Sequence, residues 1–342
     1  MRGGRATVTI AVEAVPDPIK TIRVQVNGRQ IEEQTPDIGS GGFSPGERIL
    51  DVPLAGGKNE VRITLTNAIG EKAETLVLTH EGEGALDKRG TLYILAIGVD
   101  KYPGLGKHCG SGGNASCDLD FSGADARALV AAVEKRLGPA HDRIVKRLLI
   151  NGAGGNDEPT AANILNAIDL LKEATETDTI LLFIAGHGYN EGPNYRFLPT
   201  NVELQGDTLR GATVVPWYAL QEAVETAKGR RILFIDTCHS GNAYNERLGN
   251  AAYHANIIAY TAARFDQEAL EDSKLGHGLF TYAIVEGLGA RAGLDAKRQI
   301  STKELADYVI KRVAELAKAQ KSSQEPQYFR GRDAEDYVLA SW

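Results

Sequence analysis

The chain has 342 residues, of which 42% are hydrophobic and 24% charged, and its formal net charge is −7 at pH 7. The length is sufficient for two domains that each bury a core, and the negative charge gives no reason to expect nucleic acids or acidic membranes as partners. No apolar run approaches the roughly 20 residues of a membrane span, and the N-terminus lacks the apolar stretch of a secretory signal. We therefore expect a cytoplasmic location. Three cysteines are too few and too scattered for a disulfide framework.

Residues 5–80 have the pattern of short β-strands joined by turns. Apolar and polar residues alternate over 22–26 and again over 61–66, and Asn27-Gly28 is a strong hairpin signal after the first run. Since no helical period interrupts them, these strands predict an all-β immunoglobulin-like sandwich over residues 1–82. The abrupt start in a strand-like segment also leads us to expect that the chain is cut from a longer protein.

A polar, glycine-rich stretch at 83–90 is interpreted as a linker, and the pattern changes after it. Over residues 91–342, buried-strand patterns alternate with helical ones, which predicts a mostly parallel sheet covered by helices on both faces. The expected strands are 92–99, 143–150, 179–185 and 231–235. The first expected helix carries the apolar residues Leu129, Val130, Val133 and Leu137, and the second carries Ile164, Ile168 and Leu171. The third is expected at 302–319, where Ser301 and Glu304 have the spacing of a capping box at its start. In such sheets, ligands bind beyond the carboxyl ends of the strands.

Two of these strands are followed by reactive side chains. The stretch "TILLFIAGHGYN" places His187 after one strand, and "RRILFIDTCHSGNAY" places Cys238 after another, 51 residues downstream. If the two strands are parallel neighbours, the thiol and the imidazole emerge at the same sheet edge, which suits a thiol nucleophile with a proton-shuttling base. The backbone N–H groups of Gly188 and Cys238 are the expected donors to the oxyanion.

The paired motifs "FIAGHGYN" and "FIDTCHSG" resemble the two signatures of the caspase-like cysteine peptidases. The match is closer to metacaspases and bacterial orthocaspases than to animal caspases, because residues 236–241 fit the D-x-C-H-S-G pattern of those families. The stretches "LYILAIGVDKYPG", "GADARALVAAVEKRLG" and "GHGLFTYAIVEGL" extend the resemblance over about residues 90–342. It implies a caspase-like α/β/α sandwich and cysteine-type endopeptidase activity with a Cys-His dyad.

The resemblance also implies the substrate preference. In these families, one aspartate at the start of the first helix and another two residues before the nucleophile line the pocket for the P1 side chain. The corresponding residues are Asp125 and Asp236. Two carboxylates in one partly buried pocket repel each other unless a cation lies between them, so we expect arginine or lysine at P1.

Each of these assignments has an alternative. Cys238 could be an inert buried thiol, and His187 a structural histidine. His239 could serve as the base, although adjacent side chains usually point apart. Asp236 could cap the following turn, and Asp125 could be one of the aspartates common at helix starts.

No metal site is expected, and no cofactor is chemically required. Cys109 and Cys117 flank "GSGGNAS", which we interpret as a mobile loop that a fortuitous disulfide could close. The stretch "NGAGGNDEPT" lacks the spacing of a phosphate-binding loop. Calcium is a possible activator, and Asn156, Asp157 and Glu158 in this stretch could bind it. The preferred interpretation of these residues is a solvated acidic loop.

Arg247 is the expected site of self-cleavage, because it is the only lysine or arginine at 239–256. We expect a monomer that acts on protein or peptide substrates with Arg or Lys at P1. It could be a proenzyme awaiting an activating protease or a regulatory partner, with the sandwich blocking or presenting the site. The alternative is a catalytically silent caspase-like module that serves as an assembly or adaptor protein.

Overall fold

The computed structural model describes residues 3–37, 39–106, 109, 116–191, 194–206, 208–238, 249–250, 252–253, 255–264, 267–291, 298–331 and 336–341. Arg247 and His239 lie outside these residues. The chain forms a mixed α/β structure with one large, mostly parallel sheet and several small antiparallel sheets. No helix in the described ranges has the length and hydrophobicity that crossing a membrane requires.

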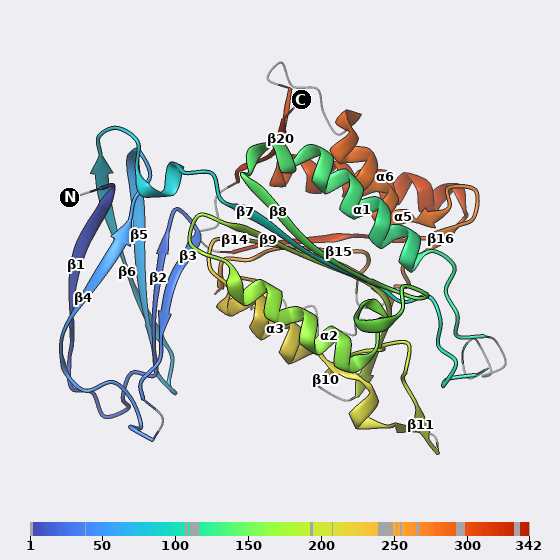
Figure 1. Cartoon of the computed structure of the whole chain (residues 1–342), viewed down its shortest axis with the longest axis horizontal. Helices are drawn as coiled ribbons and strands as arrows, with labels where there is room; N and C mark the ends of the chain where they lie inside the picture. The colour runs from blue at the N-terminus through green and yellow to red at the C-terminus, as the bar shows by residue number, and fades with distance from the viewer. Residues whose placement is uncertain are drawn as a thin grey trace.

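Six strands make up an N-terminal β-module, a name used here for residues 3–82. One antiparallel pair lies against a four-stranded sheet of order β3-β2-β5-β6 (Figure 1). The pair is β1 (Arg5–Val12) with β4 (Gly46–Pro53), and the sheet contains β2 (Thr21–Val26), β3 (Arg29–Gln34), β5 (Gly57–Thr66) and β6 (Glu71–His80). The predicted hairpin at Asn27-Gly28 is confirmed, because both residues have positive φ angles and join β2 to β3. The buried side chains between the layers include Ile22, Val24, Leu50, Val52 and Val61.

The stretch predicted as a polar linker, 83–90, is instead partly packed. It contains a 3₁₀ turn, η1 (Ala85–Asp87), and Leu86 is buried in the core of the β-module. The Asp87 carboxylate accepts hydrogen bonds from the N–H groups of Gly56 and Gly84. Leu86, the one large apolar side chain in this polar stretch, explains the difference, because its burial anchors the chain to the module before β7 begins.

The large sheet is built around five parallel strands, whose spatial order is β8-β7-β9-β14-β15. These are β7 (Thr91–Gly98), β8 (Arg143–Ile150), β9 (Thr179–Glu191), β14 (Arg230–Cys238) and β15 (Ile258–Thr261). Antiparallel strands extend it: β19 (Gln327–Arg330) beside β15, then β10 (Asn194–Phe197) beside the end of β9, and β13 (Val215–Pro216) beside β10. Two-stranded sheets are formed by β11 (Leu204–Gln205) with β12 (Thr208–Leu209), β16 (Glu271–Asp272) with β17 (His277–Gly278), and β18 (Gln299–Ser301) with β20 (Val338–Ser341).

Helices cover both faces of this sheet, as the alternating pattern predicts (Figure 1). One face carries α1 (Ser122–Arg136), α5 (Leu279–Glu286) and α6 (Thr302–Ala319). The other carries α2 (Ala161–Ala167), the 3₁₀ segment η4 (Ile168–Glu173) and α3 (Trp217–Thr226). The capping box predicted for the last helix is confirmed, because Ser301 Oγ accepts from Glu304 N, and Glu304 Oε2 accepts from Ser301 N. Because β9 is covered on both sides, residues 180–184 are fully buried.

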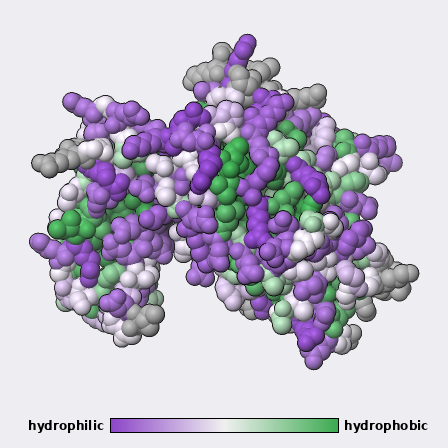
Figure 2. Space-filling view, in the orientation of Figure 1, coloured by the Kyte–Doolittle hydropathy of each residue, from purple (hydrophilic) through white to green (hydrophobic). Residues whose placement is uncertain are grey.

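The β-module meets the larger part at the amino ends of β9 and β14. Gln30 and Gly229 exchange two backbone hydrogen bonds there. Gln25 of β2 accepts a hydrogen bond from Asn256 Nδ2 at 2.8 Å and donates one to the Ala255 carbonyl at 3.4 Å. Figure 2 shows that the two parts are joined through a narrow waist. The module therefore lies at the opposite ends of these strands from Cys238, so the structure gives no support to the idea that it covers the expected site.

The buried contacts of Gln25 lead to a prediction about stability. Gln25→Leu keeps the size of this side chain, which is 2% exposed, but removes its bonds to Asn256 and Ala255. Each buried polar group that loses a partner costs about 1–3 kcal/mol, so we expect Tm to fall by about 5–10 °C. Differential scanning calorimetry measures this. Gln205→Leu, at an exposed position, should leave Tm nearly unchanged, and equal shifts in both variants would contradict the prediction.

Candidate functional site

The strands that carry the two expected catalytic residues are parallel neighbours. In the register between β14 and β9, Cys238 lies opposite His187, so their backbones are one strand spacing apart, roughly 4.8 Å. His187 does not follow the strand as the sequence suggests, because β9 continues to Glu191 and pairs with β10 beyond the apolar run. The structure therefore brings together the two residues that the motifs single out.

The imidazole of His187 has defined neighbours. Its Nε2 donates a hydrogen bond to the carbonyl oxygen of Cys117 at 2.8 Å. Its ring packs against that of Tyr102, with a centroid distance of 4.7 Å. The backbone N–H of His187 donates to the Tyr102 hydroxyl at 2.7 Å, and this hydroxyl donates to the Val99 carbonyl at 3.1 Å. Because a carbonyl only accepts, Nε2 carries a hydrogen, so Nδ1 is the nitrogen through which this ring can accept a proton.

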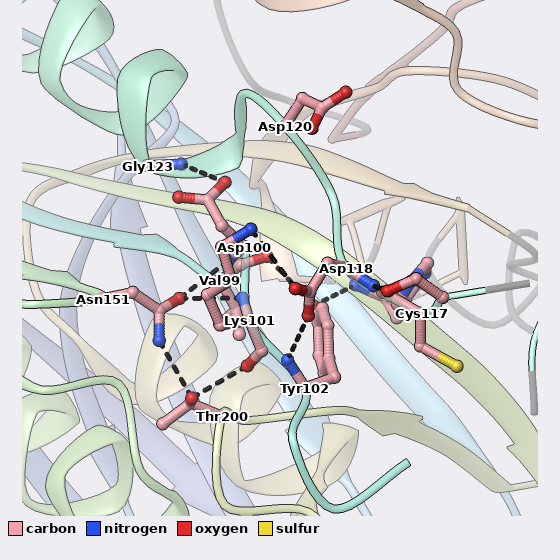
Figure 3. A network of polar contacts seen from close by, with 12 residues as sticks. Val99, Asp100, Lys101, Tyr102, Cys117, Asp118, Asp120, Gly123, Asn151 and Thr200 are labelled. Atoms are coloured by element: carbon pink, nitrogen blue, oxygen red, sulfur yellow. Dashed lines mark hydrogen bonds and ion pairs between the residues drawn. The ribbon is translucent and has the colours of Figure 1, made fainter. Parts of the chain in front are cut away.

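A polar network holds the loop that supplies Tyr102 (Figure 3). Asn151 Oδ1 accepts from the N–H groups of Asp100 and Lys101, and Asn151 Nδ2 donates to Thr200 Oγ1, which in turn donates to the Lys101 carbonyl. These bonds tie the end of β7 to the segments after β8 and β10. The loop that carries Tyr102 is therefore held by contacts with two other segments of the chain.

A second part of the same network holds the segment that supplies the Cys117 carbonyl (Figure 3). Asp118 Oδ1 accepts from Tyr102 N at 3.0 Å, and Leu119 N donates to the Asp100 carbonyl at 2.8 Å. The hydrogen bond from Tyr102 N is the main cause that lowers the pKa of Asp118. The disulfide that the sequence left as an option is present between Cys109 and Cys117. Thus the two segments that contact His187 are tied to each other.

Gly188 follows His187 in β9 and lies opposite Phe197 of β10. A Cβ atom added to this glycine would overlap the ring and the hydroxyl of Tyr195. Tyr195 is 5% exposed, and its Oη lies 2.6 Å from Thr237 Oγ1. Packing alone therefore explains a glycine here, and the oxyanion roles of Gly188 and Cys238 remain predictions.

The two aspartates expected to line the P1 pocket both lie close to Gly278. An ideal Cβ at Gly278 would be 3.0 Å from Asp125 Oδ2 and 3.3 Å from Asp236 Oδ2. Asp125 is in the first turn of α1, and Asp236 is two residues before Cys238 in β14. Both are nearly buried, with 2% and 8% of their surfaces exposed. The structure therefore gathers two carboxylates beside the end of the strand that carries Cys238.

The electrostatics of this pair follow from burial and proximity. Burial, together with the charge of Asp125, raises the pKa of Asp236 to about 7. Burial likewise raises the pKa of Asp125. Asp236 accepts a hydrogen bond from Thr281 Oγ1 at 2.7 Å, and Asp125 accepts from His277 Nδ1 at 2.6 Å and from Gly278 N at 3.0 Å. The two carboxylates thus oppose each other's ionisation, and a cation between them would relieve the repulsion.

Sequence reasoning did not assign several residues around these carboxylates. The hydrogen bond with Asp125 raises the pKa of His277, whose Nδ1 lies 2.6 Å from Asp125 Oδ1. The carboxylate of Glu271 accepts hydrogen bonds from the N–H groups of Asp120 and Phe121, just before α1. His277, Gly278 and Thr281 all belong to "GHGLFTYAIVEGL", so the quoted motif marked the segment without indicating which side chains reach the pocket.

The acidic loop considered for calcium is engaged in local contacts. Glu158 accepts hydrogen bonds from the N–H groups of Gly152 and Gly154, and Asp157 forms an ion pair with Arg147 at 3.3 Å. Over the described ranges, no cluster of three or more histidine, cysteine, aspartate or glutamate residues has an arrangement that could hold a metal ion. These contacts favour the interpretation of a hydrogen-bonded surface loop at residues 152–158.

Comparisons with known proteins add no identification. Neither the models of known protein families nor the curated proteins give a match to this chain.

Proposed function

We propose that the chain is a cysteine endopeptidase of the caspase-like type that cleaves after arginine or lysine. The observation that carries the proposal is the register of β9 and β14, which sets Cys238 beside His187, while the Cys117 carbonyl engages Nε2 of the imidazole. Nucleophilic catalysis by cysteine requires a histidine near the cysteine to take the thiol proton, and the strand register brings these two residues together. No cofactor takes part in this chemistry.

The reaction would run in two halves. Cys238 Sγ attacks the scissile carbonyl carbon as the thiol proton passes to His187 Nδ1, and a C–S bond forms. The imidazolium then protonates the leaving amine, and the C–N bond breaks to give a thioester. Water attacks the thioester, His187 accepts its proton and returns it to the sulfur, and the acid product leaves. The backbone N–H groups of Gly188 and Cys238 are the proposed donors to the oxyanion.

Two further features support the caspase-like form of this proposal. The sheet has helices on both faces, with the dyad at the carboxyl ends of neighbouring parallel strands, as ligand sites in such sheets generally are. The two-layer β-module is compatible with an immunoglobulin-like domain. Both names rest on the motifs together with these arrangements, because neither comparison identifies a relative.

The preference for arginine or lysine rests on the carboxylate pair. The carboxylates of Asp125 and Asp236 both lie beside Gly278. His277 contacts Asp125 and, when protonated, can offset one of the two negative charges. A guanidinium or ammonium group between the carboxylates would favour their ionised forms, which burial and, for Asp236, the charge of Asp125 oppose. An acidic P1 side chain would add a third negative charge, so we propose that it is excluded.

The test compares the wild type with Cys238→Ala on peptide reporters ending in Arg, Lys or Asp, with and without calcium. We expect cleavage after Arg and Lys that falls at least 1,000-fold in the variant, on the order of the loss seen when a nucleophile is removed. Cleavage after Asp would keep the peptidase but contradict the acidic pocket. If no reporter is cut, brief trypsin treatment distinguishes a proenzyme, which gains activity, from a silent assembly module, which does not.

A further inference from the structure

The carbonyl that anchors His187 belongs to a residue in a disulfide. Cys117 accepts the hydrogen bond from His187 Nε2 at 2.8 Å and is itself bonded to Cys109. Cys117 is 2% exposed, whereas Cys109 is partly exposed, so the disulfide runs from the buried carbonyl toward the surface. The residue that holds the imidazole by a hydrogen bond is therefore also part of a disulfide, whose presence depends on redox conditions.

Cys117 is held from two directions. On its downstream side, Asp118 accepts the hydrogen bond from Tyr102 N, and Leu119 donates to the Asp100 carbonyl (Figure 3). On its upstream side, the disulfide ties it to Cys109. The disulfide thus adds a covalent link to the hydrogen bonds that hold the backbone at Cys117. Breaking the disulfide would leave only the noncovalent ties.

We propose that the Cys109–Cys117 disulfide is a redox-controlled positioning element for His187. When it is formed, the Cys117 carbonyl holds the imidazole in the tautomer with hydrogen on Nε2. When it is reduced, the carbonyl is released, and the ring samples other tautomers and orientations. The consequence for catalysis rests on the proposed peptidase function, because proton transfer through Nδ1 needs this tautomer.

The redox step is a two-electron exchange with a dithiol. Attack by one thiolate of the dithiol breaks the S–S bond and forms a mixed disulfide, and its second thiolate then releases the protein cysteine. Cys109 and Cys117 each gain one electron and one proton, and the dithiol becomes a disulfide. The chain has three cysteines, so pairing of these two leaves Cys238 without a cysteine partner within the chain. The proposed peptidase would be most active when Cys238 is reduced and the other pair is oxidised.

The first experiment measures the ring without any need for activity. In a Cys238→Ala background, ¹⁵N NMR of the His187 imidazole should give the Nε2–H tautomer as the main neutral form while the disulfide is intact. Addition of dithiothreitol, or the change Cys109→Ser with Cys117→Ser, should lower that fraction at least twofold. Asp120→Asn, a change at an exposed position three residues after Cys117, should have no effect. An unchanged tautomer fraction in the reduced protein and in the double variant would overturn the proposal.

The second experiment asks whether catalysis follows the tautomer. On an Arg reporter, we expect kcat of the reduced wild type to be about 10-fold to 100-fold below that of the oxidised protein, on the scale of a small misplacement of a catalytic group. KM should change less than twofold, and reoxidation with Cys238 kept as a free thiol should restore kcat. The double serine variant should be slow and insensitive to dithiothreitol, whereas wild-type kcat in that variant would contradict the catalytic part. If the wild type cuts nothing in either state, even after brief trypsin treatment, the peptidase proposal fails, while the NMR result still decides whether the disulfide positions His187.

Discussion

Replacing Asp236 by asparagine should weaken cleavage after arginine and, at the same time, stabilise the folded protein at pH 8. Asparagine keeps the shape and can still accept the hydrogen bond from Thr281, which Asp236 accepts at 2.7 Å. It removes one of the two charges that would receive the P1 cation beside Gly278. Since losing one partner of a buried charge pair costs about 3–5 kcal/mol, kcat/KM for an Arg reporter should fall by at least 100-fold.

The stability gain depends on pH in a defined direction. Burial and the charge of Asp125 raise the pKa of Asp236 from 3.8 to about 7. The folded state therefore holds this proton more tightly than the unfolded state, so the contribution of Asp236 to stability falls as the pH rises from about 4 to 7 and is constant above that. Asparagine does not ionise, so the variant should gain little at pH 4 and about 2–4 kcal/mol at pH 8.

Calorimetry at pH 4 and pH 8 and steady-state kinetics test the two effects separately. Asp120→Asn is the matched control, because Asp120 is an exposed aspartate just before α1 and should change neither quantity. A variant that is no more stable than the wild type at pH 8 would mean that Asp236 is not held in an unfavourable ionised state. Unchanged cleavage after arginine in a stabilised variant would remove Asp236 from the P1 pocket while leaving the electrostatic account intact.

The same pair explains an expected pH dependence of substrate binding in the wild type. Below about pH 7, Asp236 is largely protonated in the free protein, so a cationic P1 side chain has to displace that proton when it binds. KM for an Arg reporter should therefore rise as the pH falls from 8 to 6, even if the dyad remains competent. Two carboxylates that repel each other when no substrate is bound lower the stability of the folded protein. Sites that bind substrate often carry a cost in stability of this kind.

The features that the sequence predicts well are those with a local cause. The capping box at Ser301 and Glu304 and the hairpin at Asn27-Gly28 depend on residues within three positions of each other. The sequence also predicts that β9 and β14 are adjacent strands. Two apolar strands joined by one crossover connection usually lie side by side in a parallel sheet. With that topology, the proximity of Asp236 and Asp125 required only the helix that follows β7.

The features that sequence reasoning missed depend on backbone groups or on distant pairing. The Cys117 carbonyl carries no side-chain signal, so no motif could indicate that His187 Nε2 would reach it. The extension of β9 to Glu191 depends on pairing with β10, which the apolar pattern does not reveal because polar residues follow His187. The position of the β-module at the amino ends of β14 arises from contacts between Gln25 and Asn256, which are 231 residues apart. The hydrogen bond between His277 and Asp125 joins residues 152 positions apart, so no local pattern could indicate it.

Gly188→Ala should be among the most destabilising single changes in the larger part of the protein. The added methyl group would occupy the position of the Tyr195 ring and hydroxyl. Tyr195 cannot move aside easily, because it is 5% exposed, contacts Thr237 Oγ1 at 2.6 Å and packs edge-on against Trp217 at a centroid distance of 5.9 Å. Overpacking of this kind costs about 1–3 kcal/mol and sometimes more, and we expect the upper end because both strands of the β9–β10 hairpin would have to shift.

A double-mutant cycle with Tyr195→Leu separates packing from catalysis at this glycine. Leucine lacks the outer ring atoms and the hydroxyl, so Gly188→Ala with Tyr195→Leu should be about as stable in urea unfolding as Tyr195→Leu alone. Alanine keeps the backbone N–H of residue 188, so if Gly188 acts through that group, the double variant should also recover the kcat of Tyr195→Leu. Recovered stability without recovered kcat would mean that the reaction needs the open space at Gly188 itself. A Gly188→Ala protein as stable as the wild type would show instead that the hairpin yields at this point, and the packing explanation would fail.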